Sequence, residues 1–195
     1  IDSTNIRAKL EAEQGAESGL LVVADQQTAG RGRRGRGWES PSGSNIYYTL
    51  MLKPDFNADC APMLTLVMAL AVAKGIRQTL GRGSEEGAAK VGIKWPNDIV
   101  LDGKKVCGIL TEMSMEQAYI HHIVIGVGIN VRRQEFPEEI RDRAAAIEEQ
   151  CGFRISRSQL IADIMEAFEE DYEIFLQTHD LKGLRDSYAK LLLNQ

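Results

Sequence analysis

Residues 91–113, VGIKWPNDIVLDGKKVCGILTEM, decide the fold that the sequence predicts, because they hold three β-like stretches in close succession. The stretches cover residues 91–95, 99–101 and 105–113. Asp102 and Gly103 separate the second stretch from the third, and an Asp-Gly pair favours a two-residue β-hairpin turn. Turns of this length join antiparallel strands. The segment therefore predicts an antiparallel meander.

Further β-like runs flank the meander on both sides. Residues 20–24 are a short apolar run, and in residues 45–52 apolar side chains alternate with others. Residues 119–131 are also β-rich and end in GVGIN, where Gly126 and Gly128 would allow a ligand to approach the strand closely. These runs extend the predicted sheet.

Helical patterns lie between and after these runs. The first predicted helix begins at DSTN and ends near Gly15, and the others cover residues 61–80, 137–150, 157–177 and about 181–193. A loop is expected over residues 83–87. Together the patterns predict an α/β (α+β) fold with a mixed, largely antiparallel sheet flanked by helices.

The overall composition is that of an ordinary globular domain. The chain has 195 residues, of which 44% are hydrophobic and 26% charged, and one domain is the default at this length. Cys60, Cys107 and Cys151 are widely spaced, so disulfide and zinc frameworks are not expected. Cys107 is expected to be a small core residue. The number and spacing of the cysteines favour a reducing, cytoplasmic setting.

The sequence also carries expectations about membranes and about a longer polypeptide. No apolar run is expected to approach the roughly 20 residues that a membrane span needs, and no signal peptide is recognised. The chain begins at Ile1 rather than Met and ends at Gln195 without an obvious terminal element. Residues 1–195 are therefore expected to be one domain of a longer polypeptide.

The arginine-rich loop, GRGRRGRGW at residues 30–38, reverses the local charge of a chain whose net charge is −5. Its arginines repel one another, so the loop should be mobile until an anion arrives, and its glycines let backbone N–H groups approach that anion. A phosphate-bearing ligand is the natural interpretation. The acidic balance argues against broad nucleic-acid affinity, which needs many cations spread over a face.

Two other interpretations of the arginine-rich loop are less favoured. Gly30, Gly32 and Gly35 formally satisfy the G-x-G-x-x-G pattern of a dinucleotide-binding turn. That turn should open a helix, whereas here Trp38 and Pro41 lead into another β-like run. A disordered RGG-type RNA-binding tract is the second alternative, although such tracts are usually longer and repeated.

Four further features are weak when each stands alone. Lys94 ends a β-like stretch before the stiff turn at Pro96, where it would neutralise an anion or simply be solvated. Ser3-Thr4-Asn5 has the composition of an ordinary helix cap, and Gln27 would either bind a ligand or be solvated. The glycines of GVGIN would mark either a ligand site or a bulge. Their joint occurrence raises the weight of all four.

Taken together and in order, the motifs resemble those of the catalytic domain of biotin protein ligases. The motifs are STN, QTAGRGRRGRGW, KWPNDI, KVCGIL and GVGIN, and the resemblance covers about residues 3–131. It implies the biotin/lipoate ligase catalytic-domain fold and a two-step reaction. Biotin carboxylate would attack the α-phosphate of Mg-ATP to give biotinyl-5′-AMP and pyrophosphate, and a lysine of an acceptor protein would then attack this anhydride.

The resemblance also implies roles for individual residues. Biotin would be bound by Ser3, Thr4, Asn5, Gln27, Arg31, Gly32, Arg33, Lys94, Gly126 and Gly128. The nucleotide would be bound by Arg33, Arg34, Trp38 and Asn130. Lys94 and Arg33 would be catalytic, because both steps develop negative charge around the α-phosphate that fixed cations stabilise.

ATP, Mg²⁺ and biotin are the implied ligands, and a biotin carboxyl-carrier protein of a carboxylase is the implied acceptor. Mg²⁺ would arrive with ATP rather than be held in a site built by the protein. His121 and His122 should point to opposite faces of a strand and so cannot hold one metal. A homodimer is implied as possible and a membrane partner is not. An N-terminal strand or DNA-binding domain and a small C-terminal β-barrel, seen in family members, are not recognised in residues 1–195.

Two alternative functions remain open from the sequence. One is a lipoate or octanoate–protein ligase or transferase of the related fold, for which an apolar slot rather than a polar pocket would be expected. The other is a non-catalytic nucleic-acid-binding module that uses the arginine-rich loop, which the acidic net charge disfavours.

Overall fold

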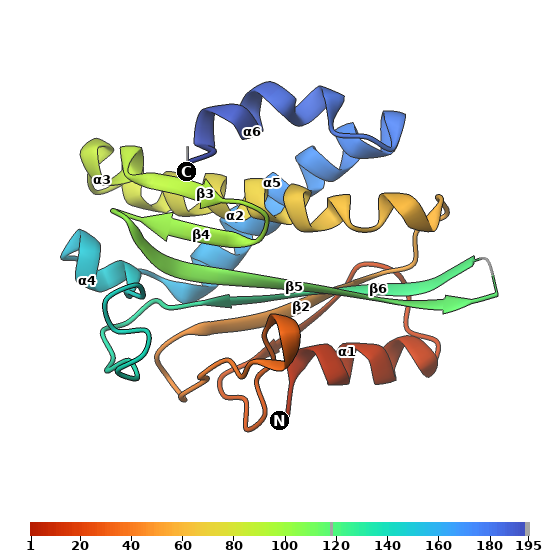
Figure 1. Ribbon diagram of the computed structural model, residues 1–195, viewed down its shortest axis with the longest axis horizontal. Helices are drawn as coiled ribbons and strands as arrows, with labels where there is room; N and C mark the ends of the chain where they lie inside the picture. Colours follow the sequence, from red (N-terminus) through yellow and green to blue (C-terminus); the bar gives the residue numbers. More distant parts are fainter. Residues whose placement is uncertain (118, 194–195) are drawn as a thin grey trace.

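The computed structural model describes residues 1–117 and 119–193, and a six-stranded sheet lies at its centre (Figure 1). The strand order is β1-β2-β6-β5-β4-β3. The strands are β1 (Leu20–Ala24), β2 (Ile46–Leu52), β3 (Val91–Lys94), β4 (Asp98–Leu101), β5 (Lys104–Glu116) and β6 (Tyr119–Ile129). All neighbouring strands are antiparallel, so the predicted fold class is confirmed, with an antiparallel rather than a mixed sheet.

The meander predicted from residues 91–113 forms the β3-β4-β5 end of the sheet. Asp102 and Gly103 make the turn between β4 and β5 with φ of 50° and 79°. A type I′ hairpin turn requires positive φ at both central positions, which explains the Asp-Gly pair. β5 then pairs with β6, and this places the last strand of the meander in the centre of the sheet.

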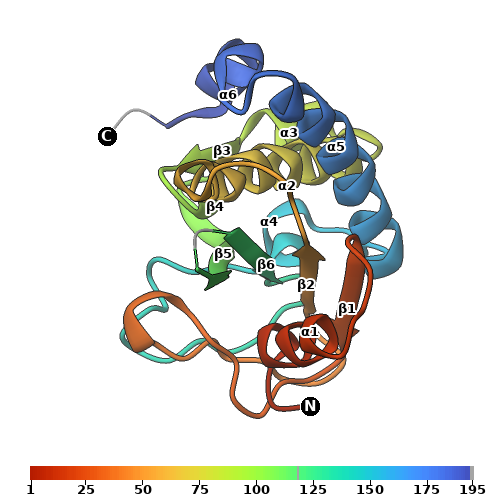
Figure 2. The ribbon, with the colours of Figure 1, turned by 90° about the vertical axis from the view of Figure 1, so that its right-hand side faces the viewer.

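Helices cover the two faces of the sheet unequally (Figure 2). The helices are α1 (Thr4–Glu13), α2 (Met63–Gly81), α3 (Glu85–Ala89), α4 (Ile147–Cys151), α5 (Arg157–Thr178) and α6 (Arg185–Leu191). α2 packs on one face and α5 packs behind it, where alternate strand residues such as Tyr48 and Ile125 join the main core. On the opposite face α1 packs against β1, β2 and β6.

Small side chains bring α1 close to the sheet. Ala8 and Ala12 are buried and pack against Met51 and Val124. Because α1 is the one helix on this face among the described residues, the face of β4, β5 and the end of β6 beside it is left uncovered. This uncovered area is the place where a ligand site can form.

α2 is the apolar centre of the main core. The segment Ala58–Gly81 reaches a mean hydropathy of 1.5 over a membrane-length window, which corrects the expectation that no run approaches that length. The segment lies between the sheet and α5, and 61% of the apolar window is buried inside the protein. Packing in a core therefore accounts for its hydropathy.

The helix predicted over residues 137–150 is wrong for most of its length, because only α4 is helical there. The backbone of the preceding segment pairs instead with Lys105 of β5. Lys105 N–H donates to the Arg143 carbonyl at 2.7 Å, and Ala145 N–H donates to the Lys105 carbonyl at 3.0 Å. Groups committed to β5 in this way cannot serve a helix.

Two smaller differences concern α3 and the C-terminal segment. α3 forms where a loop was expected, and Ser84 Oγ caps it by accepting a hydrogen bond from Gly87 N–H. The helix predicted over residues 181–193 divides into a 3₁₀ turn (Lys182–Leu184) and α6. After α6, Leu193 N–H donates to the Ile93 carbonyl, so the chain continues as an addition to the edge of β3.

Candidate functional site

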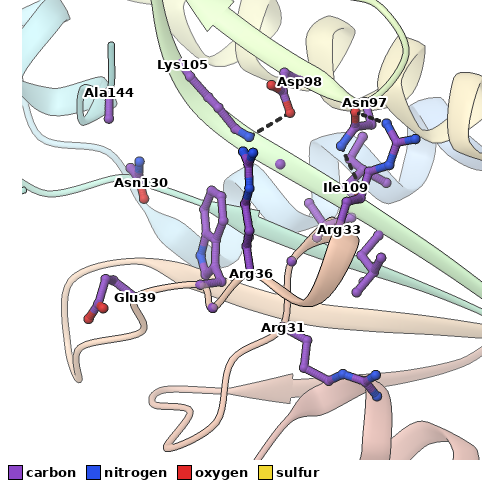
Figure 3. A pocket seen from close by; sticks show the side chains of 18 of the residues that line it. Arg31, Arg33, Arg36, Glu39, Asn97, Asp98, Lys105, Ile109, Asn130 and Ala144 are labelled. Atoms are coloured by element: carbon purple, nitrogen blue, oxygen red, sulfur yellow. Dashed lines mark hydrogen bonds and ion pairs between the residues drawn. The ribbon is translucent and has the colours of Figure 1, made fainter. Parts of the chain in front are cut away.

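A cavity of about 610 Å³ opens on the part of the sheet that α1 leaves uncovered (Figure 3). β5 and β6 make its floor, and the arginine-rich loop, the start of α1, the β3–β4 turn and residues 134–144 make its walls. Every site residue that the sequence nominated lines this cavity: Ser3, Thr4, Asn5, Gln27, Arg31, Gly32, Arg33, Arg34, Trp38, Lys94, Gly126, Gly128 and Asn130. The structure thus brings together motifs that are far apart along the chain.

The arginine-rich loop folds over the cavity as a short hairpin. Gly32 N–H donates to the Arg36 carbonyl at 2.8 Å, and Trp38 N–H donates to the Gly30 carbonyl at 3.0 Å. At the tip, Arg34 adopts φ of 58° within a 3₁₀ turn. These hydrogen bonds give the loop a defined path, while its mobility before an anion binds stays a prediction.

The arginines of the loop point in different directions. Arg33 Nη1 donates to Asn97 Oδ1 at 2.8 Å, whereas Arg31 Nη2 lies 3.5 Å from Glu112 Oε1. Figure 3 shows Arg36 reaching toward Lys105 across the cavity. All of these guanidinium groups remain exposed, so an anion in the cavity can meet several of them at once.

Hydrogen-bonded polar side chains close the end of the cavity next to α1. Gln27 Oε1 accepts from Thr4 N–H at 2.9 Å and from the Thr4 hydroxyl at 3.1 Å. The Thr49 hydroxyl lies 2.8 Å from Thr4 Oγ1 and 2.6 Å from Asn5 Oδ1. Gln27 is therefore held within the protein rather than solvated, and Thr49, which the sequence did not nominate, is part of the same network.

Glu112 of β5 anchors this polar end. Asn5 Nδ2 donates to Glu112 Oε2 at 2.8 Å, and Lys9 Nζ donates to Glu112 Oε1 at 2.9 Å. Burial alone would raise the pKa of Glu112, but the hydrogen bonds from Asn5 and Lys9 and the charges of Lys9 and Arg31 outweigh it and lower that pKa. Glu112 is thus an ionised group that connects α1 to the loop.

Ser3 does not act as the ordinary helix cap that its position suggests. It occupies the N-cap position of α1, yet its side chain makes no capping hydrogen bond. Its N–H donates instead to Asp2 Oδ1 at 2.6 Å. The Ser3 hydroxyl lines the cavity and is not committed to the helix, so it is available to a ligand.

The glycines of GVGIN make room for side chains of the chain itself, while their expected role beside a ligand stays a prediction. A Cβ on Gly126 would collide with the Asn5 amide, and a Cβ on Gly128 would lie 2.5 Å from the Trp38 indole nitrogen. Trp38 also lies over Gly108, where a Cβ would be 2.9 Å from its ring. Asn5 and Trp38, packed on these glycines, form the surface that a ligand would meet.

Two lysines line the cavity, and the sequence nominated only one of them. Lys94 is exposed at the end of β3. Lys105 projects from β5, with Nζ 2.7 Å from Asp98 Oδ1 and 5.5 Å from the Trp38 ring centroid. Lys105 belongs to the KVCGIL region that supported the family resemblance, and that was the available signal for it.

The remaining wall comes from residues 134–144, which overlap the start of the helix predicted over residues 137–150. Gln134, Phe136, Ile140, Arg143 and Ala144 line the cavity beside Trp38 and Asn130. They were missed because their exposure to the cavity depends on the pairing of residues 143–145 with β5, which no local pattern reveals. This wall combines an apolar surface with one additional cation.

No group of three metal-ligating side chains occurs in residues 1–117 and 119–193. His121 Nδ1 and His122 Nδ1 nevertheless lie 2.8 Å apart, so the expectation that the two rings point to opposite faces is wrong. A register shift between Ser114 and Met115 on the paired strand distorts the regular alternation here. Cys107 is buried in the core as predicted, and burial raises the pKa of its thiol.

Residues 1–130 match the model of the Biotin/lipoate A/B protein ligase family. The chain belongs to this family. Among curated proteins it is similar to the bifunctional ligase/repressor BirA of Bacillus subtilis (strain 168), with 41% identity over 194 residues. It is also similar to the biotin--[acetyl-CoA-carboxylase] ligase of Paracoccus denitrificans, with 42% identity over 130 residues and coverage of 67% of this chain and 51% of that protein.

Solved structures of family members have the same fold. The biotin protein ligase from Aquifex aeolicus in complex with biotin and ATP superposes with a TM-score of 0.80 at 31% identity, covering 98% of this chain and 75% of that one. The biotin protein ligase from Leishmania major in complex with biotinyl-5-AMP superposes with a TM-score of 0.73 at 26% identity, and the match covers 100% of this chain and 80% of that one. The match to the Bacillus subtilis relative covers 97% of this chain but only 57% of that protein, so the chain spans little more than half of the relative's length.

Proposed function

We propose that this chain activates biotin with ATP and transfers it to a lysine of a biotin carboxyl-carrier domain. The observation that carries the proposal is that one cavity combines a hydrogen-bonded polar end with a loop of arginines. The polar end, built on Thr4, Gln27 and Glu112, suits the ureido head of biotin. The arginines suit a carboxylate and phosphates. The ligands named for the solved relatives support the same choice.

In the first step a carboxylate oxygen of biotin attacks the α-phosphorus of ATP, the bond from that phosphorus to the β-phosphate oxygen breaks, and pyrophosphate leaves. Two anions must meet for this attack. Arg33, Lys94 and Lys105 line the cavity in which they would meet and would reduce their repulsion. Each charge-assisted hydrogen bond contributes about 1.5–3 kcal/mol, so several of them together hold the charged transition state.

In the second step the neutral ε-amine of the acceptor lysine attacks the acyl carbon of biotinyl-5′-AMP. AMP leaves with the electrons of the broken C–O bond, and the amine nitrogen loses a proton as the amide forms. The arginine-rich loop lies over the cavity and would keep water from hydrolysing the anhydride before the acceptor arrives. No covalent link between biotin and this chain is needed.

Mg²⁺ fits this cavity as an ion that is carried by the nucleotide. The cavity lining includes the carboxylates of Glu39 and Asp98, which are oxygen donors of the kind that Mg²⁺ accepts. Asp98 is paired with Lys105, and the described residues contain no group of three metal-ligating side chains. When bound, the ion would neutralise phosphate charge, while the orientation of the phosphates falls to Arg33, Arg34 and the lysines.

The same proposal extends to partners and setting. The acceptor would be the biotin carboxyl-carrier protein of a carboxylase, and the reaction would take place in the cytoplasm. A homodimer through a sheet edge is part of the proposal. Among the described residues, β5 has a strand partner on one side only beyond Ile109, because β4 pairs only with its first half. This free edge is a surface on which another strand can add.

Native mass spectrometry of the chain with biotin, ATP and Mg²⁺ tests the proposal. We expect a retained mass of biotinyl-5′-AMP, and a carrier domain added afterwards should gain one biotin on one lysine. Lipoate and octanoate in place of biotin are the matched controls. Retention of a lipoyl or octanoyl adenylate would favour the related ligase activity, and retention of no adenylate would contradict the proposal.

A further inference from the structure

Asn97, which the sequence did not nominate, lies where the arginine-rich loop meets the sheet. It is in the KWPND turn between β3 and β4, lines the cavity, and is 64 residues from Arg33 along the chain. Arg33 Nη1 donates to Asn97 Oδ1 at 2.8 Å, as Figure 3 shows. One hydrogen bond thus connects the tip of the loop to the turn.

Two hydrogen bonds to β5 fix the orientation of Asn97. Its Nδ2 donates to the Ile109 carbonyl at 3.0 Å, and its own carbonyl accepts from Ile109 N–H at 3.0 Å. Because the amide nitrogen is committed to Ile109, the amide oxygen must face the loop. The acceptor for Arg33 is therefore held by the sheet rather than by another loop.

The acceptor is also uncharged, and this matters for a guanidinium that must meet a phosphate. Arg33 makes no ion pair with any residue that the structure describes. Its hydrogen bond to Asn97 uses one of five guanidinium N–H donors, so the others remain for a ligand. A carboxylate at position 97 would hold Arg33 as well, but it would cancel the charge that attracts a phosphate.

We propose that Asn97 is a positioning residue for the adenylate: it holds the Arg33 guanidinium at a fixed place over the cavity without neutralising it. The inference rests on the proposed function, because the phosphate of biotinyl-5′-AMP is the anion that Arg33 would meet. Since Asn97 acts through Arg33, its removal matters for the adenylate only while Arg33 is present. Free biotin, which lacks a phosphate, is affected much less.

A double-mutant cycle tests this inference with the wild-type chain, Asn97→Ala, Arg33→Ala and the double variant. Each protein is loaded with synthetic biotinyl-5′-AMP, and the dissociation rate of the adenylate is measured after addition of excess biotin. We expect Asn97→Ala to speed dissociation about tenfold, as for the loss of one hydrogen bond to a charged group. In the Arg33→Ala background we expect Asn97→Ala to add nothing. The Kd for biotin should stay near that of the wild type.

The other outcomes of the cycle would overturn either the role proposed for Asn97 or the proposed function. Equal effects of Asn97→Ala in both backgrounds would show that Asn97 only supports the turn. A dissociation rate in Arg33→Ala equal to that of the wild type would show that Arg33 does not hold the adenylate, so Asn97 could not act through it. A wild-type chain that binds no biotinyl-5′-AMP would contradict the proposed function instead. If Asn97→Ala fails to fold, Asn97→Asp replaces it. We expect faster dissociation from that variant, and an unchanged rate would overturn the inference.

Discussion

The two lysines of the cavity differ in what surrounds them, and that difference ranks them. Lys94 is exposed at the strand end, whereas the Nζ of Lys105 lies between Asp98 and the Trp38 ring on the cavity floor. A cation that the protein already holds in place stabilises developing charge without reorganisation. We therefore expect Lys105 to contribute more to adenylate formation than Lys94.

Lys105→Ala should lower the rate of biotinyl-5′-AMP formation by about 10²–10³-fold, as for the loss of one preorganised donor to a transition state. Lys94→Ala should lower it less. Pyrophosphate release at saturating biotin and ATP measures both rates, with circular dichroism as the check on folding. A larger loss in Lys94→Ala than in Lys105→Ala would reverse the ranking and restore the role that the sequence assigned to Lys94.

Glu112 offers a second prediction at the scale of one residue. The pKa of Glu112 is lowered in the folded protein, so its ionised form stabilises the fold above the unfolded-state pKa, and this contribution is lost as pH falls through the folded-state value. Glu112→Gln should therefore unfold more easily than the wild type at pH 7, and the difference should shrink below about pH 4.3. Urea unfolding over a pH series measures it.

Glu116→Gln is the matched control for Glu112→Gln, because Glu116 is exposed at the far end of the same strand. That variant should follow the wild type at every pH. A constant difference between Glu112→Gln and the wild type down to low pH would mean that the ionised carboxylate is not what stabilises the contacts to Asn5 and Lys9.

At the scale of elements, the contact between α2 and α5 depends on one glycine. A Cβ on Gly75 would lie 2.5 Å from a side-chain carbon of Ile164 and 3.0 Å from its backbone, so α5 would have to move away. Gly81, at the end of the same helix, would place its Cβ 4.0 Å from the nearest atom. The two positions share a helix but differ in the space around them.

Gly75→Ala should destabilise the protein by about 1–3 kcal/mol through overpacking. Gly81→Ala should be neutral or stabilising by up to about 1 kcal/mol, because alanine favours a helix. Free energies of unfolding from urea titrations measure both. Similar losses in the two variants would show that the helix end tolerates a methyl group no better than the interface does.

Elements with a strong local pattern were predictable from the sequence. β1 has the bounds that its apolar run indicates, and the Asp102-Gly103 turn has the φ values that an Asp-Gly pair favours. The failure over residues 137–150 has a physical cause. The backbone of residues 143–145 pairs with Lys105, and a partner nearly 40 residues away leaves no trace in local periodicity.

Site residues that belong to recognisable motifs were predictable from the sequence, whereas isolated site residues were not. Every nominated residue lines the cavity, yet Asn97, Lys105 and Glu112 were missed. Each of these is a common residue type, and the partners of Asn97 and Glu112, such as Arg33 for Asn97, lie far away in sequence. Gly128 lines the cavity, and Trp38 of the same chain packs against it, a contact that the sequence did not indicate.

At the scale of the whole molecule, the cavity is a junction of segments that lie far apart in the sequence. The start of α1, the arginine-rich loop, the β3–β4 turn and residues 134–144 meet around it. Asp25, just before the loop, is also paired with Arg157 of α5 at 3.0 Å. A ligand that touches all of these walls must therefore stabilise the molecule as a whole.

Biotin and ATP together should raise the thermal midpoint more than either ligand alone. At 100 times Kd a ligand adds about 2.7 kcal/mol, which corresponds to about 5–10 °C for a domain of this size. Differential scanning fluorimetry measures the shift, and hydrogen exchange should show protection in the loop and in residues 134–144 together. Lipoate with ATP is the control and should give no comparable shift. Protection confined to the loop would mean that the nucleotide does not reach the far wall, and the position assigned to it beside Trp38 and Asn130 would then be wrong.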